Sequence, residues 1–129
     1  MSALEAAALW AALLLLLMLA LSLRTVQQRF RHRVRLGDGG VPEMEQAVRV
    51  FGNAAEYVPG ALIALVLLAL LETDPRLIHG LGATFFVGRL AHAFGLSRSG
   101  GQSPGRALGV VLTWVVYLVA AGLLLFSAL

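Results

Sequence analysis

The chain has 129 residues, of which 59% are hydrophobic and 13% are charged, and its mean hydropathy is +0.84. A soluble domain of this size is less apolar, so we expect one integral membrane domain without a separate soluble one. The absence of cysteine excludes disulfides, thiolate metal sites and a thiol nucleophile carried by the protein. The sequence also has no metal-ligand spacing, phosphate-binding loop or Ser-His-Asp arrangement, so no metal site is expected.

The first apolar run covers residues 6–23, and only Ser22 in it is polar. A helix needs roughly 20 apolar residues to cross a bilayer, so we predict a membrane helix at about residues 4–31. A cleaved signal peptide is the alternative. However, the segment carries Glu5 in place of a basic start and is followed by arginines rather than by a small-residue cleavage site. We therefore interpret it as a retained helix.

The second apolar run covers residues 46–71 and predicts a helix at about residues 44–71. Pro42 marks its start, and acidic residues follow in the first turn, where the helix dipole favours them. Pro59 removes one backbone hydrogen bond inside this helix. A kink there would open space beside Glu56.

Two further apolar runs, residues 77–96 and 107–129, predict helices at about residues 76–96 and 104–128. Backbone groups in lipid must find hydrogen-bond partners within the chain, so helices are the structure that these lengths allow. The sequence therefore predicts an all-α integral membrane protein. Its one domain, residues 1–129, is expected to be an up-down antiparallel bundle of four transmembrane helices.

Small residues recur at every fourth position in the third and fourth predicted helices. Such rows let membrane helices approach closely, and we interpret them as packing surfaces. The rows are Gly80, Thr84, Gly88 and His92 in the third helix and Gly105, Gly109, Thr113, Tyr117 and Ala121 in the fourth.

The charge pattern predicts the orientation of the chain. The formal net charge is +3, and all ten basic residues are arginine. Loops rich in arginine stay on the cytoplasmic side, so we expect the first and third connections there and both termini on the opposite side. The basic excess is thus a topology signal and a contact for anionic membrane lipids, not a sign of nucleic-acid binding. The arginines that follow the first run are Arg24, Arg29, Arg31, Arg33 and Arg35.

The most informative polar residues lie where the second run begins. On a helix of about 100° per residue, Arg49, Asn53 and Glu56 fall within about 60° of one another, and Tyr57 flanks them. Ionisable groups at such depth usually face a protein interior or a watery cavity and mark a functional site. This face predicts a site for a small polar ligand with both signs of charge. The alternative is a structural pair of Arg49 with Glu56, within or between chains.

Three residues of the later helices are further candidates. Arg89 and His92 share a face near the cytoplasmic end of the third helix, and Arg106 begins the fourth. A cation at a helix start opposes the dipole, which favours an anionic ligand beside Arg106 over a topology signal alone. For Arg89 the alternatives are snorkelling or a pair with Glu56, and for His92 they are packing or capping.

These residues closely resemble motifs of the MAPEG superfamily, the membrane-associated proteins of eicosanoid and glutathione metabolism, and the resemblance covers nearly the whole chain. The second helix resembles the family signature through Pro42-Glu43-Met44-Glu45 and Arg49-x-x-x-Asn53-x-x-Glu56-Tyr57-x-Pro59. The third helix resembles that of the prostaglandin E synthase branch through Gly88-Arg89-Leu90-Ala91-His92. The start of the fourth resembles the family's segment with the thiolate-activating arginine through Pro104-Gly105-Arg106.

The resemblance implies a homotrimer in a bacterial inner membrane, with glutathione bound as a co-substrate between protomers near the cytoplasmic face. Glutathione offers carboxylates to arginines, an ammonium to Glu56 and amides to Asn53. A neighbouring arginine lowers the pKa of its thiol. The residues that the resemblance assigns to glutathione are Arg49, Asn53, Glu56, Tyr57, Arg29 (or Arg31), Arg89 and His92, and the catalytic residue is Arg106.

The implied function is glutathione transferase or peroxidase activity on lipophilic electrophiles. The first alternative is a non-enzymatic lipid-binding or scaffold member of the same family, which thiol-dependent turnover would exclude. Several relatives that use glutathione contribute tyrosines from the third helix where this chain has Ala93 and Leu96. The second alternative is a small multidrug exporter, but such a transporter needs a carboxylate midway along its first helix, whereas Glu5 is at the start.

Overall fold

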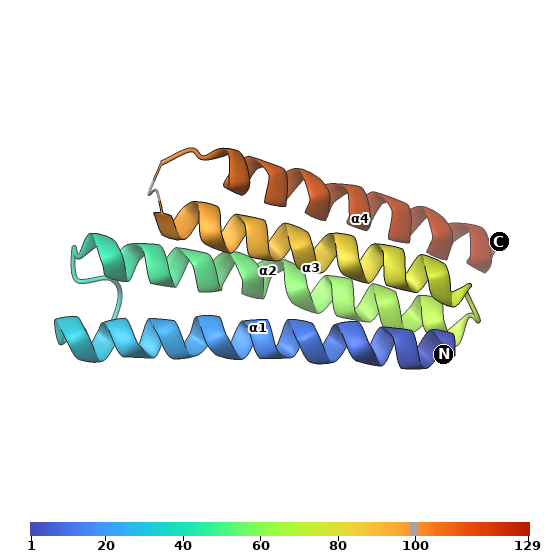
Figure 1. The fold of residues 1–129 in the computed structure, drawn as a ribbon, viewed down its shortest axis with the longest axis horizontal. Helices are drawn as coiled ribbons and strands as arrows, with labels where there is room; N and C mark the ends of the chain where they lie inside the picture. Colours follow the sequence, from blue (N-terminus) through green and yellow to red (C-terminus); the bar gives the residue numbers. More distant parts are fainter. Residues whose placement is uncertain (99–100) are drawn as a thin grey trace.

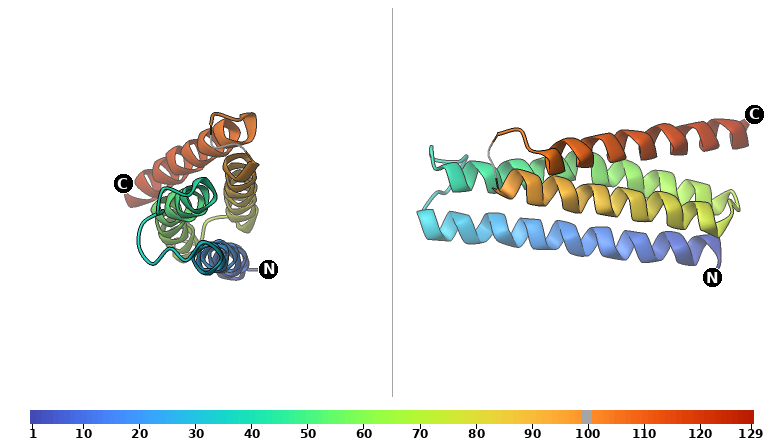
Figure 2. Two further views of the ribbon diagram at one scale, coloured as in Figure 1. Left: turned by 90° about the vertical axis from the view of Figure 1, so that its left-hand side faces the viewer. Right: turned by 45° about the horizontal axis from the view of Figure 1, so that its top comes forward.

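A computed structural model describes residues 1–98 and 101–129, and these residues form four α-helices (Figure 1). The helices lie side by side along one long axis (Figures 1 and 2). Both termini lie at one end of the bundle, and the first and third connections lie at the other. The predicted all-α, up-down antiparallel bundle is therefore confirmed. The helices are α1 (Ala3–His32), α2 (Pro42–Leu70), α3 (Pro75–Arg98) and α4 (Pro104–Ala128).

The helices begin at residues whose chemistry favours a helix start. Ser2 caps α1: its Oγ accepts from the Glu5 N–H at 3.2 Å, and the Glu5 carboxylate accepts from the Ser2 N–H at 2.7 Å. This reciprocal pair satisfies two backbone N–H groups that have no partner within the helix. The other three helices begin with Pro42, Pro75 and Pro104, since the missing N–H of proline leaves no donor unsatisfied in a first turn.

Three helices of the described residues, α1, α2 and α4, are long and apolar enough to cross a membrane. The less apolar α3 packs against each of the other three helices. Its polar residues Arg89 and His92 are buried, so the bundle shields them from lipid. The chain is therefore an integral membrane bundle. Large apolar side chains cover its outside, among them Leu15, Leu16, Leu19, Ile63 and Leu118.

Glycines set how closely α3 and α4 approach. A Cβ atom at Gly109 would lie 2.5 Å from the Gly88 carbonyl oxygen and 2.6 Å from the His92 Cβ. A Cβ atom at Gly88 would lie 3.0 Å from the Leu112 Cβ. The packing role predicted for the small residues is confirmed at these positions. At Gly80 a Cβ would meet nothing within 4 Å, so that glycine lies outside the contact.

At the end that carries the termini, Trp10 joins α1 to α3. Its Nε1–H donates to His79 Nδ1 at 3.1 Å, and its ring packs against Phe86. The ring also lies on Gly82, where any Cβ atom would collide with it. This contact fixes the far end of the bundle and leaves the opposite end to the candidate site.

Candidate functional site

A cavity of about 350 Å³ lies between α2, the end of α3 and the start of α4. Its lining residues belong to the first half of α2, the end of α3 and the start of α4, so it lies toward the end of the bundle where α1 ends and α2 begins. Five of the residues predicted to form a site meet in its lining: two arginines, a carboxylate, an amide and an imidazole. The lining consists of Val48, Arg49, Gly52, Asn53, Glu56, His92, Leu96 and Arg106.

The α2 side of this cavity carries both charges that the helix periodicity brings together. Arg49 and Glu56 are exposed in the single chain, and Asn53 between them is half-buried. Within the described part of the chain, neither Arg49 nor Glu56 forms an ion pair. The structural alternatives, in which Glu56 pairs with Arg49 or with Arg89, are therefore not adopted within one chain. Both charged groups remain available to a ligand.

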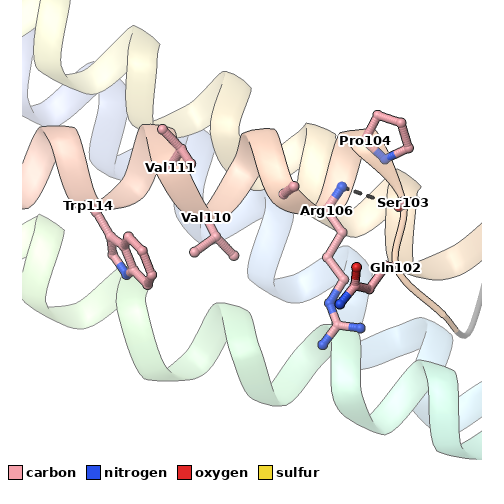
Figure 3. Close-up of a pocket in the computed structure, with 8 residues that line it drawn as sticks. Gln102, Ser103, Pro104, Arg106, Val110, Val111 and Trp114 are labelled. Carbon is pink, nitrogen blue, oxygen red and sulfur yellow. Dashed lines mark hydrogen bonds between the residues drawn. The ribbon is translucent and has the colours of Figure 1, made fainter.

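Arg106 enters the cavity from the first turn of α4. Ser103 caps this helix by accepting the Arg106 N–H on its Oγ at 3.3 Å. The Arg106 side chain extends from α4 toward α2 (Figure 3). There it lines both the cavity of about 350 Å³ and a smaller one of about 170 Å³ that also includes Arg49 and Glu45. Two guanidinium groups thus border the same polar space.

Arg106 also borders a third and more apolar cavity of about 690 Å³ along α4. Val110, Val111 and Trp114 form its far part, and Figure 3 shows these side chains following Arg106 along the helix. Val111 and Trp114 are exposed on the outside of the bundle, where lipid would lie. Sequence reasoning missed this cavity. The sequence did contain an indication of it: Val110, Val111 and Trp114 follow Arg106 by four, five and eight residues, a spacing that places apolar side chains beside the cation on a helix.

Arg89 is 2% exposed and does not line the polar cavity. Its guanidinium donates to Asn53 Oδ1 at 2.7 Å, to the Gly109 carbonyl at 3.0 Å and to Thr113 Oγ1 at 2.6 Å. It is therefore a buried cation whose hydrogen-bond partners, among the described residues, are all neutral. The sequence predicted that Arg89 binds the ligand, and the structure places it one layer behind Asn53.

Tyr57 turns from the cavity into the bundle. Its ring lies 5.3 Å from the Arg89 guanidinium carbon and edge-on to the Tyr117 ring at 5.8 Å. The Tyr117 hydroxyl donates to the Tyr57 carbonyl at 2.5 Å and fills the space beside Gly60, where a Cβ atom would collide with it. Within one chain Tyr57 supports the cavity wall and does not line it.

Arg29 lies apart from the polar cavity, at the end of α1. It donates to the carbonyl groups of Arg35 at 3.3 Å and Gly37 at 3.1 Å, which ties the first connection to the helix. A separate cavity of about 570 Å³ lies beside it. Arg31 in the same last turn is exposed. Neither arginine reaches the cavity between α2, α3 and α4 of its own chain.

Comparison with known proteins finds a family match that includes parts of all four helices. A sequence model described as the MAPEG family matches residues 7–126. The chain is 33% identical over 112 residues to the inner membrane protein YecN of Escherichia coli strain K12, an alignment that covers 87% of this chain and 84% of the relative. YecN of Escherichia coli O6:H1 strain CFT073 matches with the same identity and coverage. The region matched by the family includes every residue of the polar cavity.

Proposed function

Since the chain belongs to the MAPEG family, we propose that it binds glutathione or a similar small thiol and joins it to lipophilic electrophiles. The observation that carries this proposal is the cavity of about 350 Å³. It brings Arg49, Asn53, Glu56 and Arg106 from two helices into one space without ion pairs among them. By likeness to the inner membrane protein YecN, we place the protein in a bacterial inner membrane.

The chemistry of the lining matches the groups of glutathione. Arg49 suits a carboxylate, Glu56 suits the ammonium, and Asn53 suits an amide or carboxylate group. Hydrogen bonds of this kind, with one charged partner, are stronger than those between neutral groups. The partly enclosed cavity also lowers the competition from water. A zwitterionic peptide thiol therefore fits this lining better than an apolar or singly charged molecule does.

Arg106 is the residue to which we assign activation of the thiol. A guanidinium beside a thiol favours the charged form, so the thiolate is available at neutral pH. The thiolate sulfur then forms a bond to the electrophilic carbon, and the leaving group departs with its electron pair. With a second glutathione, the same thiolate would reduce a hydroperoxide to an alcohol and water, giving the disulfide. The apolar cavity with Val110, Val111 and Trp114 offers a place for the lipophilic reactant.

The exposed charges of α2 support an oligomer, and the arrangement implied by the family makes a homotrimer the one that we propose. Arg49 and Glu56 face outward from a helix that crosses the membrane, and charged groups facing lipid are costly. A second copy of the chain over this face would enclose them. The arrangement implied by the family, with the thiol between protomers, would also let Arg29 or Arg31 of a neighbouring copy approach the ligand.

A second candidate function is lipid binding without catalysis. It is favoured by the apolar cavity of about 690 Å³, whose Val111 and Trp114 are exposed on the outside of the bundle. The two functions differ in one measurable respect. If the purified protein is an enzyme, it should conjugate glutathione to an aryl halide. A protein that only binds lipid would leave the halide unchanged.

Calorimetric titration of the purified protein with glutathione tests the proposal. Glu56→Gln removes the negative charge and keeps the shape, so we expect affinity to fall roughly ten- to a hundredfold. Glu43→Gln is the matched control, because Glu43 is an exposed acid in the first turn of α2 and does not line the cavity. Absence of glutathione binding by the unmodified protein, or equal affinity in both variants, would show that this face does not bind the thiol.

A further inference from the structure

We infer that Arg89 is a positioning residue that fixes the orientation of the Asn53 side-chain amide. In this orientation Asn53 presents its N–H groups to the cavity, so the ligand must place a hydrogen-bond acceptor there. The identity of that ligand rests on the proposed function. The contact between Arg89 and Asn53 is independent of the proposed function, since both residues belong to the described bundle.

The chemistry of arginine decides which atom of the amide faces it. A guanidinium has only N–H donors and no acceptor. The Asn53 atom that lies 2.7 Å from Arg89 Nη1 must therefore be the carbonyl oxygen Oδ1. A flipped amide would place two donors against each other. Because Asn53 lines the cavity and its Oδ1 already accepts from Arg89, Nδ2 is the side-chain atom that has no hydrogen-bond partner among the described residues and can donate to a ligand.

Arg89 is itself held firmly enough to impose this orientation. Its Nη2 donates to the Gly109 carbonyl and to Thr113 Oγ1, and the Thr113 hydroxyl donates to the same carbonyl at 2.8 Å. The rings of Tyr57 and Phe85 lie 5.3 Å and 5.7 Å from the guanidinium carbon. These contacts come from α2, α3 and α4, so residues of three helices together hold the two terminal nitrogens of the guanidinium in place.

The fixed amide gives the cavity a polarity along α2. Asn53 offers donors, and Glu56, three residues later on the same face, offers an acceptor. The buried positive charge behind Asn53 also strengthens its donors. A zwitterionic ligand can therefore enter in one direction, with a carboxylate or carbonyl oxygen at Asn53 and an ammonium at Glu56. A ligand reversed end to end would place like charges and unpaired donors together.

A double-mutant cycle on glutathione binding tests whether Arg89 acts through Asn53. Asn53→Ala and Arg89→Met are each expected to weaken binding of glutathione roughly ten- to a hundredfold in calorimetry. The double variant should bind no more weakly than Asn53→Ala alone, because the amide that Arg89 orients is already absent. If the two losses multiply instead, Arg89 acts through its charge or through the fold, and the inference is wrong.

Asn53→Asp provides a second test that does not depend on Arg89→Met being folded. The new carboxylate can accept from Arg89, so the thermal midpoint without ligand should be no lower than that of the unmodified protein. Its second oxygen replaces the donor toward the cavity, so glutathione affinity should fall at least as far as in Asn53→Ala. Gln27→Glu, an amide-to-acid change at an exposed position of α1, is the control for added charge.

A lowered midpoint in Asn53→Asp would show that the contact with Arg89 is not formed. Unchanged affinity in Asn53→Asp would show that Asn53 does not donate to the ligand. Either result overturns the inference. If the unmodified protein binds no glutathione, the proposed function fails on its own, and the midpoint of Asn53→Asp still decides whether Arg89 fixes this side chain.

Discussion

Two arginines near the third connection have different surroundings and therefore different expected roles. Arg98 ends α3 and is exposed, and it borders none of the cavities described above. Arg106 is half-buried at the start of α4 and borders three cavities. A charge in a partly enclosed place acts more strongly on a neighbour than one in open water does. Arg106 is thus the better placed to stabilise a thiolate.

Arg106→Ala should slow conjugation of glutathione with an aryl halide and leave glutathione binding nearly unchanged. A neighbouring cation lowers a thiol pKa by about 1 to 3 units, so the thiolate fraction and the rate at neutral pH should fall roughly ten- to a thousandfold. Steady-state kinetics and the ultraviolet absorbance of the bound thiolate measure the two effects. Arg98→Ala is the control and should behave like the unmodified protein. Unchanged thiolate absorbance in Arg106→Ala would move the activating role to Arg29 or Arg31.

At the scale of the helices, the contact of α3 with α4 determines the geometry behind the site. Gly88 and Gly109 let the two backbones approach, and this approach brings the Gly109 carbonyl within 3.0 Å of Arg89. Arg89 in turn reaches Asn53 on α2. A change in the packing of α3 against α4 should therefore move Arg89 and alter the position of Asn53 on α2.

Gly109→Ala is expected to destabilise the protein by about 1–3 kcal/mol, because the added methyl group must push α3 away or strain the chain. Gly122→Ala on the same helix is the matched control, since its Cβ would meet nothing within 4 Å. Thermal unfolding in detergent compares the two variants. Equal unfolding midpoints for the two variants would contradict the close contact of α3 with α4 at Gly109. Glutathione affinity should also fall in Gly109→Ala alone, through the displaced Arg89.

The helix periodicity is the part of the site that could be predicted from the sequence. The face of α2 with Arg49, Asn53 and Glu56 follows from a fixed angle of about 100° per residue, which no packing alters. Which face of one helix meets a particular residue of another depends on how far each helix is rotated. Contact of Arg89 and Tyr57 with the ligand stays a prediction, and the rotation of α3 that places Arg89 behind Asn53 could not be derived from the sequence. That rotation depends on side-chain volumes on three helices at once.

Loops were harder to predict than helices for a related reason. Arg29 itself lies in α1, but the direction of its side chain depends on the path of the first connection, because its guanidinium donates to the carbonyl groups of Arg35 and Gly37 there. The turn also contains left-handed backbone at Arg33, with φ of 56°, which composition alone does not predict. The helical bundle was predictable because apolar length decides it.

At the scale of the whole molecule, the exposed Arg49 and Glu56 predict an oligomer. The purified protein should have three times the 13.7 kDa mass of one chain in native mass spectrometry from a mild detergent. The physical reason is the cost of leaving these charges on a lipid-facing helix. A monomer or a dimer as the main species would contradict the trimer.

The orientation in the membrane can be tested because the sequence lacks cysteine, so a single introduced cysteine is the only thiol. Leu36→Cys probes the arginine-rich connection and Ser127→Cys the end of α4, and both positions are exposed. With the basic connections in the cytoplasm, an impermeant maleimide should label Ser127→Cys in spheroplasts. It should label Leu36→Cys only after the membrane is permeabilised. The reverse pattern would invert the proposed topology.

The position of Arg106 between a polar cavity and a lipid-facing one has a kinetic consequence. In the proposed reaction glutathione would be dissolved in water and the electrophile would be partitioned into the bilayer, so the two substrates would have concentrations in different phases. We expect the rate to saturate with glutathione in moles per litre but with the electrophile in mole fraction of lipid. Adding inert phospholipid at a fixed total amount of electrophile should therefore slow the reaction by surface dilution, although every bulk concentration of the reactants stays the same.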